Sequence, residues 1–498
     1  MNRKILVGLT AICLLLSGCS NTSSQISEEP ITFKIASIND LHGSVENVGE
    51  EPGLSKLTTY LKDNYDDNDL LLANGDMWQG NGESNLNHGR LVTEWMNSVG
   101  FDCMAIGNHD FDWGVDAIKE NRAVADFPFI SSNIYNYTDG TVKNHCDDLA
   151  DLSAVLTVGS YKVGVIGAIG REQYTSITSS LVSDIDFVDP YSIIKSEAVR
   201  LRTEEDCSAV IAEIHAPQED GNVLSSGMQG LAETDSTTKK KYVDAVFCGH
   251  SHNNKSFYYN GVPYIRATAY GKAISDVEIT INPDKTVNVD NYGYHNINQA
   301  SLTTDPATET LLNRYRAAQD PILDVKLGKN HDLTSTFMDT ESLANLNAKV
   351  NYEAVVSAGY TDVDISVVNT ARNSLDSGEV TFRDVYRSFP FDNKIVIMTV
   401  SSADLYNETV VYSNYIYNPH HIAAPSYGGT KTYKIAVIDY VGLHQNAGHE
   451  YNYFPSMSDT QILSGDDYLP RTLVKKYLNT LTYLSDSDYQ STSADFSY

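Results

Sequence analysis

The sequence predicts an α/β protein built from two domains, and three observations lead to this prediction. The chain has 498 residues, more than one hydrophobic core usually organises, and 41% of them are hydrophobic. Short apolar runs alternate with amphipathic segments from Ile31 to about Asn298. A charged, helix-like segment then separates this region from a second one, in which helix-like and strand-like patterns are mixed.

The first domain, residues 31–298, is expected to be a layered α/β unit with buried sheets. Its apolar runs are short and nearly continuous, which is typical of central strands covered on both faces. Amphipathic segments at 53–65, 90–100 and 191–206 predict helices between the strands. The runs expected to form strands are residues 31–38, 69–75, 101–107, 127–133, 161–169, 208–214, 243–249 and 262–270.

Residues 299–325 are predicted to form a linker helix, because they are charged and have a helix-like pattern. The second domain, residues 326–484, is expected to be α/β or α+β. Residues 485–498 have no apolar period and are expected to form a disordered tail. Within the second domain a helix is expected at 340–360, and strands are expected at 363–369, 393–400 and 433–441.

The N-terminus carries the features of an export signal. Arg3 and Lys4 precede an apolar run that is too short to span a bilayer, and "LSGC" follows it. This arrangement resembles a bacterial lipoprotein signal, in which residues 1–18 are removed and Cys19 is lipidated. Residues 19–30 would then be a flexible tether, and lipid alone would hold the extracytoplasmic protein at the cell membrane. The alternative is an ordinary secretory signal with an incidental cysteine.

The net charge limits the possible partners. Against 35 lysines and arginines the chain has 65 acidic residues, so its formal net charge is −30. Such a charge repels polyanions, which argues against a nucleic acid polymer as a partner. A small anion can still bind where the site supplies concentrated positive charge, and metal ions are the obvious means.

Four cysteines remain once the signal is set aside: Cys103, Cys146, Cys207 and Cys248. Three of them lie in apolar runs, where a free cysteine is expected to be a small buried hydrophobic side chain. Their spacing indicates neither a disulfide framework nor a paired C-x-x-C zinc site.

Polar side chains follow five apolar runs of the first domain at the point where each run ends. Because ligands of layered α/β folds bind where strands end, these side chains are expected to gather at one rim of the sheets. Carboxylate, amide and imidazole groups together suit borderline divalent ions such as zinc, manganese or iron(II). Two such ions activate water and neutralise a phosphoryl group, which is the chemistry of phosphoester hydrolysis. The five stretches are "ASINDLHG", "LANGD", "AIGNHDFD", "AEIH" and "CGHSH".

The ordered set D-x-H, G-D, G-N-H-[DE], H and G-H-x-H resembles the calcineurin-like metallophosphoesterases. Within them, the extended "GNHDFDWG" and the large C-terminal domain are similar to the 5′-nucleotidase family. The resemblance spans nearly all of the mature chain. It implies an N-terminal four-layer α/β/β/α sandwich, a C-terminal α/β (α+β) domain for substrate specificity, and two divalent ions (Zn²⁺, Mn²⁺ or Fe²⁺).

The resemblance also implies the metal ligands, with Asp76 as the bridge between the two ions. Some family members have glutamine where His252 stands, a difference that concerns metal preference only. One ion would be held by Asp40, His42, Asp76 and His252, and the other by Asp76, Asn108, His215 and His250.

His109 is not a ligand according to this resemblance. It matches the histidine that touches the transferred phosphoryl group and assists the leaving oxygen. Asp112 matches the carboxylate that orients and charges this histidine. Asp110, between them, is expected to be a structural carboxylate.

Four residues of the second domain are implied to bind substrate. "VVNTARNSLDSGEVTFRDVYRSFPFDN" resembles a family stretch that contains N-G-G-G-I-R and, later, P-F-G-N. Asn369 and Arg372 match its asparagine and arginine, and Arg372 would contact phosphate or a sugar hydroxyl. Phe391 and Tyr440 match two rings that sandwich the purine, with an ordinary place in the core as the alternative for both.

Three departures from the family leave the substrate open. His449 stands in the place of an aspartate, the "NTAR" loop is shortened, and Asp339 lies near the position of another phosphate-binding arginine. Less positive charge and altered turns would change which phosphate ester fits.

Three functional hypotheses follow. The first is a surface-anchored, monomeric, metal-dependent phosphomonoesterase that converts nucleoside monophosphates to nucleoside and phosphate. The second is a relative with the same metals that acts on 2′,3′-cyclic nucleotides, 3′-nucleotides or nucleotide sugars. The third is a binding lipoprotein on an inactive scaffold, against which the complete set of ligands argues.

Overall fold

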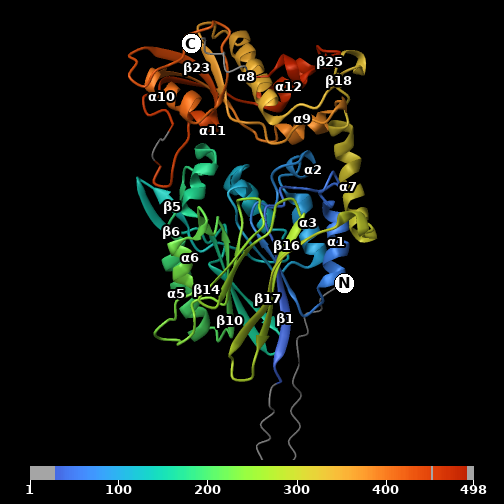
Figure 1. Ribbon diagram of the computed structural model, residues 1–498, viewed down its shortest axis with the longest axis vertical. Helices are drawn as coiled ribbons and strands as arrows, with labels where there is room; N and C mark the ends of the chain where they lie inside the picture. The colour runs from blue at the N-terminus through green and yellow to red at the C-terminus, as the bar shows by residue number, and fades with distance from the viewer. Residues whose placement is uncertain (1–28, 450–452, 491–498) are drawn as a thin grey trace, which may run out of the picture.

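The structure is a computed structural model that describes residues 29–449 and 453–490. The predicted signal peptide, Cys19, most of the tether and the last eight residues of the predicted tail lie outside the described residues. The described chain forms two domains, stacked along the long axis and joined at one side by α7, Pro306–Leu323 (Figure 1). The predicted α/β class is confirmed.

Two six-stranded sheets pack face to face in the first domain. Their orders are β17-β16-β1-β2-β3-β4 and β14-β15-β13-β10-β8-β7. The first sheet contains β1 Ile31–Ile38, β2 Leu70–Asn74, β3 Cys103–Ala105, β4 Phe129–Ile130, β16 Ala273–Ile281 and β17 Val287–Asn296. The second contains β7 Ser153–Val158, β8 Tyr161–Ile169, β10 Ala209–His215, β13 Ala245–Cys248, β14 Lys255–Tyr259 and β15 Val262–Arg266.

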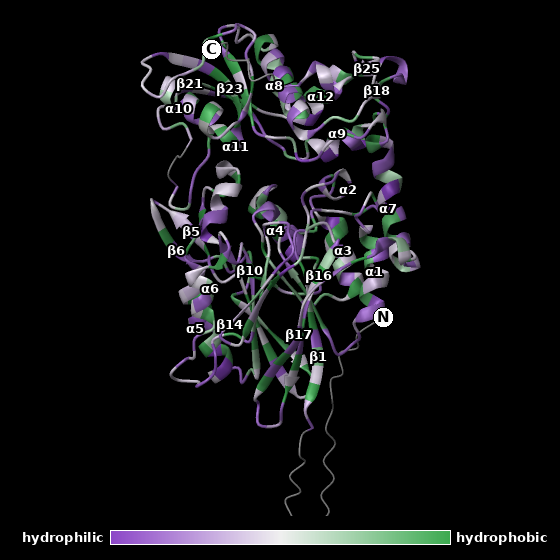
Figure 2. Ribbon diagram, viewed as in Figure 1, coloured by the Kyte–Doolittle hydropathy of each residue, from purple (hydrophilic) through white to green (hydrophobic). Residues whose placement is uncertain are grey.

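Helices cover the outer faces of both sheets, so the domain has the four layers that the resemblance implies. The interior between the sheets is buried and mostly apolar, with Ile35, Leu72, Val165 and Ile211 among its members, and it also holds a buried hydrogen bond from Ser37 to Glu213. This burial on both faces explains the nearly continuous apolar runs of the strands, which Figure 2 shows as green ribbon. The first sheet is covered by α1 Gly53–Asn64, α3 Arg90–Val99 and α4 Gly114–Arg122, and the second by α5 Pro190–Thr203 and α6 Ser226–Leu231.

The direction of the strands decides where the polar loops lie. In the first sheet β1, β2 and β3 are parallel neighbours, and in the second β8, β10 and β13 are. Parallel neighbours end at the same edge of a sheet, and this edge of the sandwich faces the second domain (Figure 1). The loops after these strands therefore meet at the boundary between the domains.

The second domain contains a five-stranded sheet of order β22-β19-β23-β21-β24, with helices on both faces. Its strands are β19 Ile365–Val368, β21 Ile395–Ser401, β22 Tyr415–Tyr417, β23 Thr432–Ile438 and β24 Ser458–Leu463. Its main helices are α8 Thr340–Ser357, α9 Phe382–Ser388, α10 Ser402–Tyr406, α11 Asp439–Gly442 and α12 Pro470–Leu478.

One predicted strand of this domain ends early and continues as a helix. The predicted strand 433–441 ends at Ile438, and α11 begins at Asp439. The buried Asp439 carboxylate accepts hydrogen bonds from the backbone N–H groups of Lys394 and Tyr440, both at 3.0 Å. These bonds turn the chain, so Tyr440 lies on a helix and not in the sheet.

A small sheet of β5 Ile134–Thr138, β6 Thr141–His145 and β9 Ile185–Phe187 forms beside the sandwich, although no apolar run predicts it. Residues 485–490, placed in the predicted tail, include the short helix Asp486–Asp488, and Asn345 Nδ2 donates to the Tyr489 carbonyl at 2.8 Å.

The four cysteines are buried and free. In the described part of the chain, no helix combines the length and apolarity needed to cross a membrane.

Candidate active site

The polar ends of the strands converge at the edge that faces the second domain. Asp40 and His42 follow β1, Asp76 follows β2, His215 ends β10, and His250 and His252 follow β13. They form two groups, and within each group the candidate ligand atoms lie within 4.8 Å of one another. The first group is Asp40, His42 and His252, and the second is Asp76, His215 and His250.

The Asp76 carboxylate lies between the two groups. Its Oδ2 atom is 3.2 Å from Nε2 of His215 in the second group and 3.8 Å from Nε2 of His42 in the first. Asn108 belongs with the second group, because its Oδ1 atom lies 3.0 Å from Nδ1 of His250. The structure thus brings together all seven predicted ligands, with the predicted bridge in the middle.

The chemistry of this set fits divalent cations. Asp40 Oδ1, Asp76 Oδ2 and His215 Nε2 are buried and face one another at 3.2–3.9 Å, but none of the three forms a well-aligned hydrogen bond within the described residues. A buried polar atom without a partner typically costs about 1–3 kcal/mol. Three such atoms facing one another are accounted for if cations bind between them.

Hydrogen bonds to the far side of two histidine rings support the same interpretation. Nδ1 of His42 lies 2.9 Å from the Gln79 carbonyl oxygen, and Nδ1 of His215 lies 2.7 Å from the Asn74 carbonyl oxygen. A carbonyl oxygen can only accept, so each Nδ1 carries a proton, and Nε2 is the ring nitrogen that faces the site. This arrangement is usual for histidines that bind metals.

The backbone at the site is strained. Asp40, His42, Asp76, His250 and His252 all have positive φ angles, between 51° and 73°. Side-chain-bearing residues rarely adopt this conformation, which costs on the order of 1–3 kcal/mol each and clusters at functional sites. The surrounding fold therefore holds these side chains inward at a cost to local stability.

Asp110 is the structural carboxylate that the sequence predicts. It is fully buried and accepts hydrogen bonds from the backbone N–H groups of Asp76, Met77 and Gly107, at 2.9–3.1 Å. Burial and the nearby charge of Asp76 raise the pKa of Asp110 to about 7. Gly107 allows this close approach of two loops, because a Cβ atom there would lie 2.3 Å from Asp76 Oδ1.

His109 and Asp112 form the predicted pair. Nδ1 of His109 lies 2.9 Å from Oδ2 of Asp112. Burial alone would lower the pKa of His109, but the charges of Asp112 and Asp76 outweigh it and raise this pKa. The pair therefore favours a protonated imidazole whose other nitrogen, Nε2, is left for a substrate.

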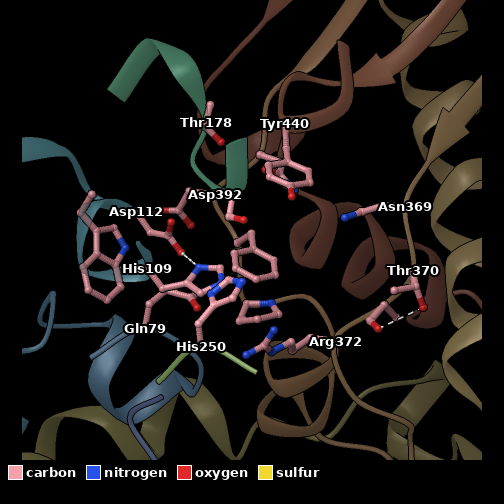
Figure 3. A pocket seen from close by; sticks show the side chains of 16 residues that line it. Gln79, His109, Asp112, Thr178, His250, Asn369, Thr370, Arg372, Asp392 and Tyr440 are labelled. Carbon is pink, nitrogen blue, oxygen red and sulfur yellow. Dashed lines mark hydrogen bonds and ion pairs between the residues drawn. The ribbon is translucent and has the colours of Figure 1, made fainter. Parts of the chain in front are cut away.

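A cavity of about 290 Å³ opens beside this pair, between the two domains. Figure 3 shows His109, His250 and Arg372 at one end and Tyr440 at the other. The four residues predicted to bind substrate all line it: Asn369, Arg372, Phe391 and Tyr440.

Two of these four residues approach the polar rim of the first domain closely. Nη2 of Arg372 lies 3.0 Å from Nε2 of His42, so this side chain crosses from the second domain to the metal ligands. The Phe391 ring centre lies 5.4 Å from that of His109. The second domain therefore supplies both a cation and an aromatic ring beside the candidate reaction centre.

Two residues that the sequence associates with the substrate do not line the cavity. Asp339 caps α8, where its side chain accepts from the Ser342 backbone N–H at 2.8 Å. His449 stacks on Tyr137 of the first domain, with ring centres 3.8 Å apart, and its Nε2 donates to the Ile185 carbonyl at 3.0 Å.

The cavity also has lining residues that sequence reasoning missed. Ser176 and Thr178 come from the hydroxyl-rich run "YTSITSS", whose lack of an apolar period indicates a loop but not its position. Ser179 next to them donates to the Leu443 carbonyl at 2.7 Å, and this contact joins the two domains. The other residues missed were Gln79, Trp113, Thr370, Ala371, Pro390, Asp392 and Asn393.

Two family models match the chain. The model of the calcineurin-like phosphoesterases matches residues 33–254, and that of the 5′-nucleotidase C-terminal domain matches residues 323–407. The first covers the strands that carry the candidate ligands. The second covers the Asn369–Arg372 loop and Phe391.

Known proteins of similar length support both matches. A 5′-nucleotidase of Vibrio parahaemolyticus is 24% identical over 463 residues, which cover 81% of this chain and 80% of the relative. Protein UshA of Yersinia enterocolitica is 24% identical over 481 residues, 84% of each chain. Among solved structures, a 5′-nucleotidase precursor of Thermus thermophilus aligns with a TM-score of 0.72 at 16% identity, over 91% of this chain and 97% of that one.

The unpaired buried atoms predict that divalent cations stabilise the protein. A cation at about a hundred times its Kd adds about 2.7 kcal/mol to the stability of the folded state. Adding Mn²⁺ or Zn²⁺ to chelator-treated protein should therefore raise the unfolding temperature of the first domain in calorimetry. The Asp76→Asn variant should lose most of this rise, and His109→Ala should keep it. A wild-type unfolding temperature that does not respond to either cation contradicts the metal assignment.

Proposed function

This chain belongs to the 5′-nucleotidase family of calcineurin-like metallophosphoesterases, and from that premise we propose that it releases phosphate from nucleoside 5′-monophosphates outside the cytoplasm. It is a metal-dependent phosphoester hydrolase. The identity of the ester, the roles of single residues and the membrane anchor are proposals.

The proposed substrate is inferred from the way charged and aromatic groups are distributed along the cavity. One end is formed by the metal-ligand groups, His109 and Arg372, all of which favour a phosphoryl group. Tyr440 lies at the other end, and the Phe391 ring lies beside His109; both rings offer flat faces for stacking. A phosphate joined to a planar base through a sugar matches both ends.

Each residue has a proposed task in the reaction. Cations bound by the seven ligands would supply activation of water and neutralisation of phosphoryl charge. Arg372 holds the phosphate by charge-assisted hydrogen bonds, since it already reaches His42 at the ligand group. His109 points Nε2 at the phosphoryl group and donates a proton to the leaving sugar oxygen, while Asp112 fixes its ring and keeps it charged. Phe391 and Tyr440 hold the base.

The same metal ligands and the same pair would also serve a 2′,3′-cyclic nucleotide, a 3′-nucleotide or a nucleotide sugar. The difference among these esters lies in the part of the substrate that the second domain holds. The shortened loop Asn369–Arg372 is therefore the part of the site that would most readily fit a different ester.

The division of labour predicts different failures for two variants. His109→Ala should lower kcat by about a hundredfold or more, the usual loss when a general acid or base is removed, without loss of bound metal. Asp76→Asn should lower the metal content itself. Both are measured as phosphate release together with metal content by atomic emission. Equal loss of metal in both variants would argue against separate roles.

A panel of esters tests the substrate. With Mn²⁺ or Zn²⁺ present, 5′-AMP should be hydrolysed with a higher kcat/KM than 3′-AMP, 2′,3′-cyclic AMP or a nucleotide sugar. Release of phosphate is the measurement. If 5′-AMP is not turned over while one of the other esters is, that ester replaces it as the substrate. If no ester is hydrolysed and no divalent cation binds, the binding-lipoprotein hypothesis returns.

The proposed anchor is supported only by the sequence, by the apolar run that ends in "LSGC". It is tested separately from the reaction. In cells that express the full chain, the protein should sediment with membranes after lysis. The Cys19→Ala variant should lose its lipid and no longer sediment, as detected by immunoblot. Membrane association that is unchanged in Cys19→Ala would contradict lipid attachment at this residue.

A further inference from the structure

The segment that carries Phe391 is held from both sides by polar contacts to its backbone. Asn85 of the first domain donates to the Pro390 carbonyl at 2.9 Å through its side-chain amide. Arg471 of the second domain donates to the Phe391 carbonyl at 3.0 Å and forms an ion pair with Asp392. The position of the Phe391 ring therefore depends on side chains outside the cavity.

The Arg471 guanidinium makes most of these contacts. The side chain is 92% buried, and its Nη1 atom also reaches the Pro390 carbonyl at 3.5 Å. Its Cζ atom lies 4.4 Å from the centre of the Tyr386 ring, on which the guanidinium packs. A planar fork can reach a carboxylate and neighbouring carbonyl groups while it packs on a ring, and a lysine ammonium cannot do all of this.

The second aromatic ring is tied to the same segment. Asp439 accepts from the backbone N–H of Lys394, three residues after Phe391, and from that of Tyr440. The backbone N–H of Asp439 in turn donates to the Lys394 carbonyl at 2.9 Å. The two ring-bearing segments are thus connected through one buried carboxylate, and Arg471 holds the end that carries Phe391.

We propose, on the basis of the proposed function, that Arg471 is the positioning residue for Phe391 and sets how strongly the cavity retains a planar base. Arg471 does not line the cavity and touches no reacting atom. It fixes the backbone of residues 390–392, so that the Phe391 ring stands beside His109 and is already ordered when a nucleotide enters. A ring held in advance loses less conformational freedom on binding, which raises affinity.

This role predicts a selective loss. Arg471→Met keeps the length and apolar packing of the side chain but removes the fork. The KM for 5′-AMP should rise by about tenfold, as expected when one of two stacking contacts is weakened. The KM and kcat for ribose 5-phosphate, which has the same sugar and phosphate but no base, should stay within about twofold of wild type. Arg471→Lys should fall between wild type and Arg471→Met.

Two controls separate positioning from a general structural effect. Lys476→Met removes a cation from an exposed site on the same helix and should leave KM and kcat unchanged for both substrates. Phe391→Ala should raise the KM for 5′-AMP at least as much, and the double variant with Arg471→Met should be no worse on 5′-AMP than Phe391→Ala alone, because both changes remove one contact. Thermal midpoints are recorded for all variants, and Arg471→Lys serves if Arg471→Met does not fold.

Titration with adenosine in a calorimeter gives a reading that does not require turnover. Wild type should bind adenosine more tightly than Arg471→Met and Phe391→Ala. Equal losses on 5′-AMP and ribose 5-phosphate, additive effects in the double variant, or adenosine binding that is absent in wild type or unchanged in Arg471→Met would overturn the role of Arg471. Wild-type protein that binds adenosine but hydrolyses neither ester would instead contradict the proposed function.

Discussion

Two buried carboxylates dominate the architecture of this protein. Asp40 and Asp76 are fully inaccessible to water, and each has an oxygen without a hydrogen-bond partner in the described part of the chain. Burial penalises an ionised carboxylate strongly unless positive charge lies next to it. Here burial would raise the pKa of Asp76, but His215 and His109 outweigh it and hold the pKa well below its ordinary value. The site is thus built to keep negative charge buried, and divalent cations are the natural counter-charge.

Much of the first domain is arranged to place and hold these two buried carboxylates. Parallel strands bring the two carboxylates to one edge, backbone angles of positive φ turn the ligands inward, and Asp110 ties the Asp76 loop to the loop of Gly107. The strain is tolerated because the sandwich beneath it is closely packed and apolar. In a chain with a net charge of −30, this small region is where positive charge can be concentrated for an anionic substrate.

The second domain supplies aromatic rings beside the reaction centre and contacts that hold it against the first domain. Arg383 pairs with Glu83 of the first domain and with Asp320 and Asp324 around α7, so both domains and the linker meet at one arginine. Across the cavity, His449 is packed against Tyr137. Contacts on both sides hold the domains together over the cavity, and the reaction centre of one domain lies against the aromatic rings of the other.

The sequence predicts the site better than it predicts the cavity. The candidate ligands lie just after apolar runs, and the edge where parallel strands end is fixed by the fold class, so the polar stretches could be located in advance. The resemblance to the metallophosphoesterases then picked the seven ligands from these stretches. The cavity depends on how two domains meet. Ser176 and Thr178 come from a loop without an apolar period. His449 lies away from the cavity because it contacts the first domain, and no feature of the local sequence predicts these contacts. Likewise Tyr440 sits in a predicted strand, and only the bonds of Asp439 show that the chain turns before it.

The most direct test of the account is anomalous X-ray diffraction from crystals grown with Mn²⁺, with data collected on both sides of the manganese absorption edge. The account predicts two anomalous peaks, one beside Asp40, His42 and His252 and one beside Asn108, His215 and His250, with the Asp76 carboxylate in contact with both. A single peak, or none at these residues at saturating Mn²⁺, would contradict it.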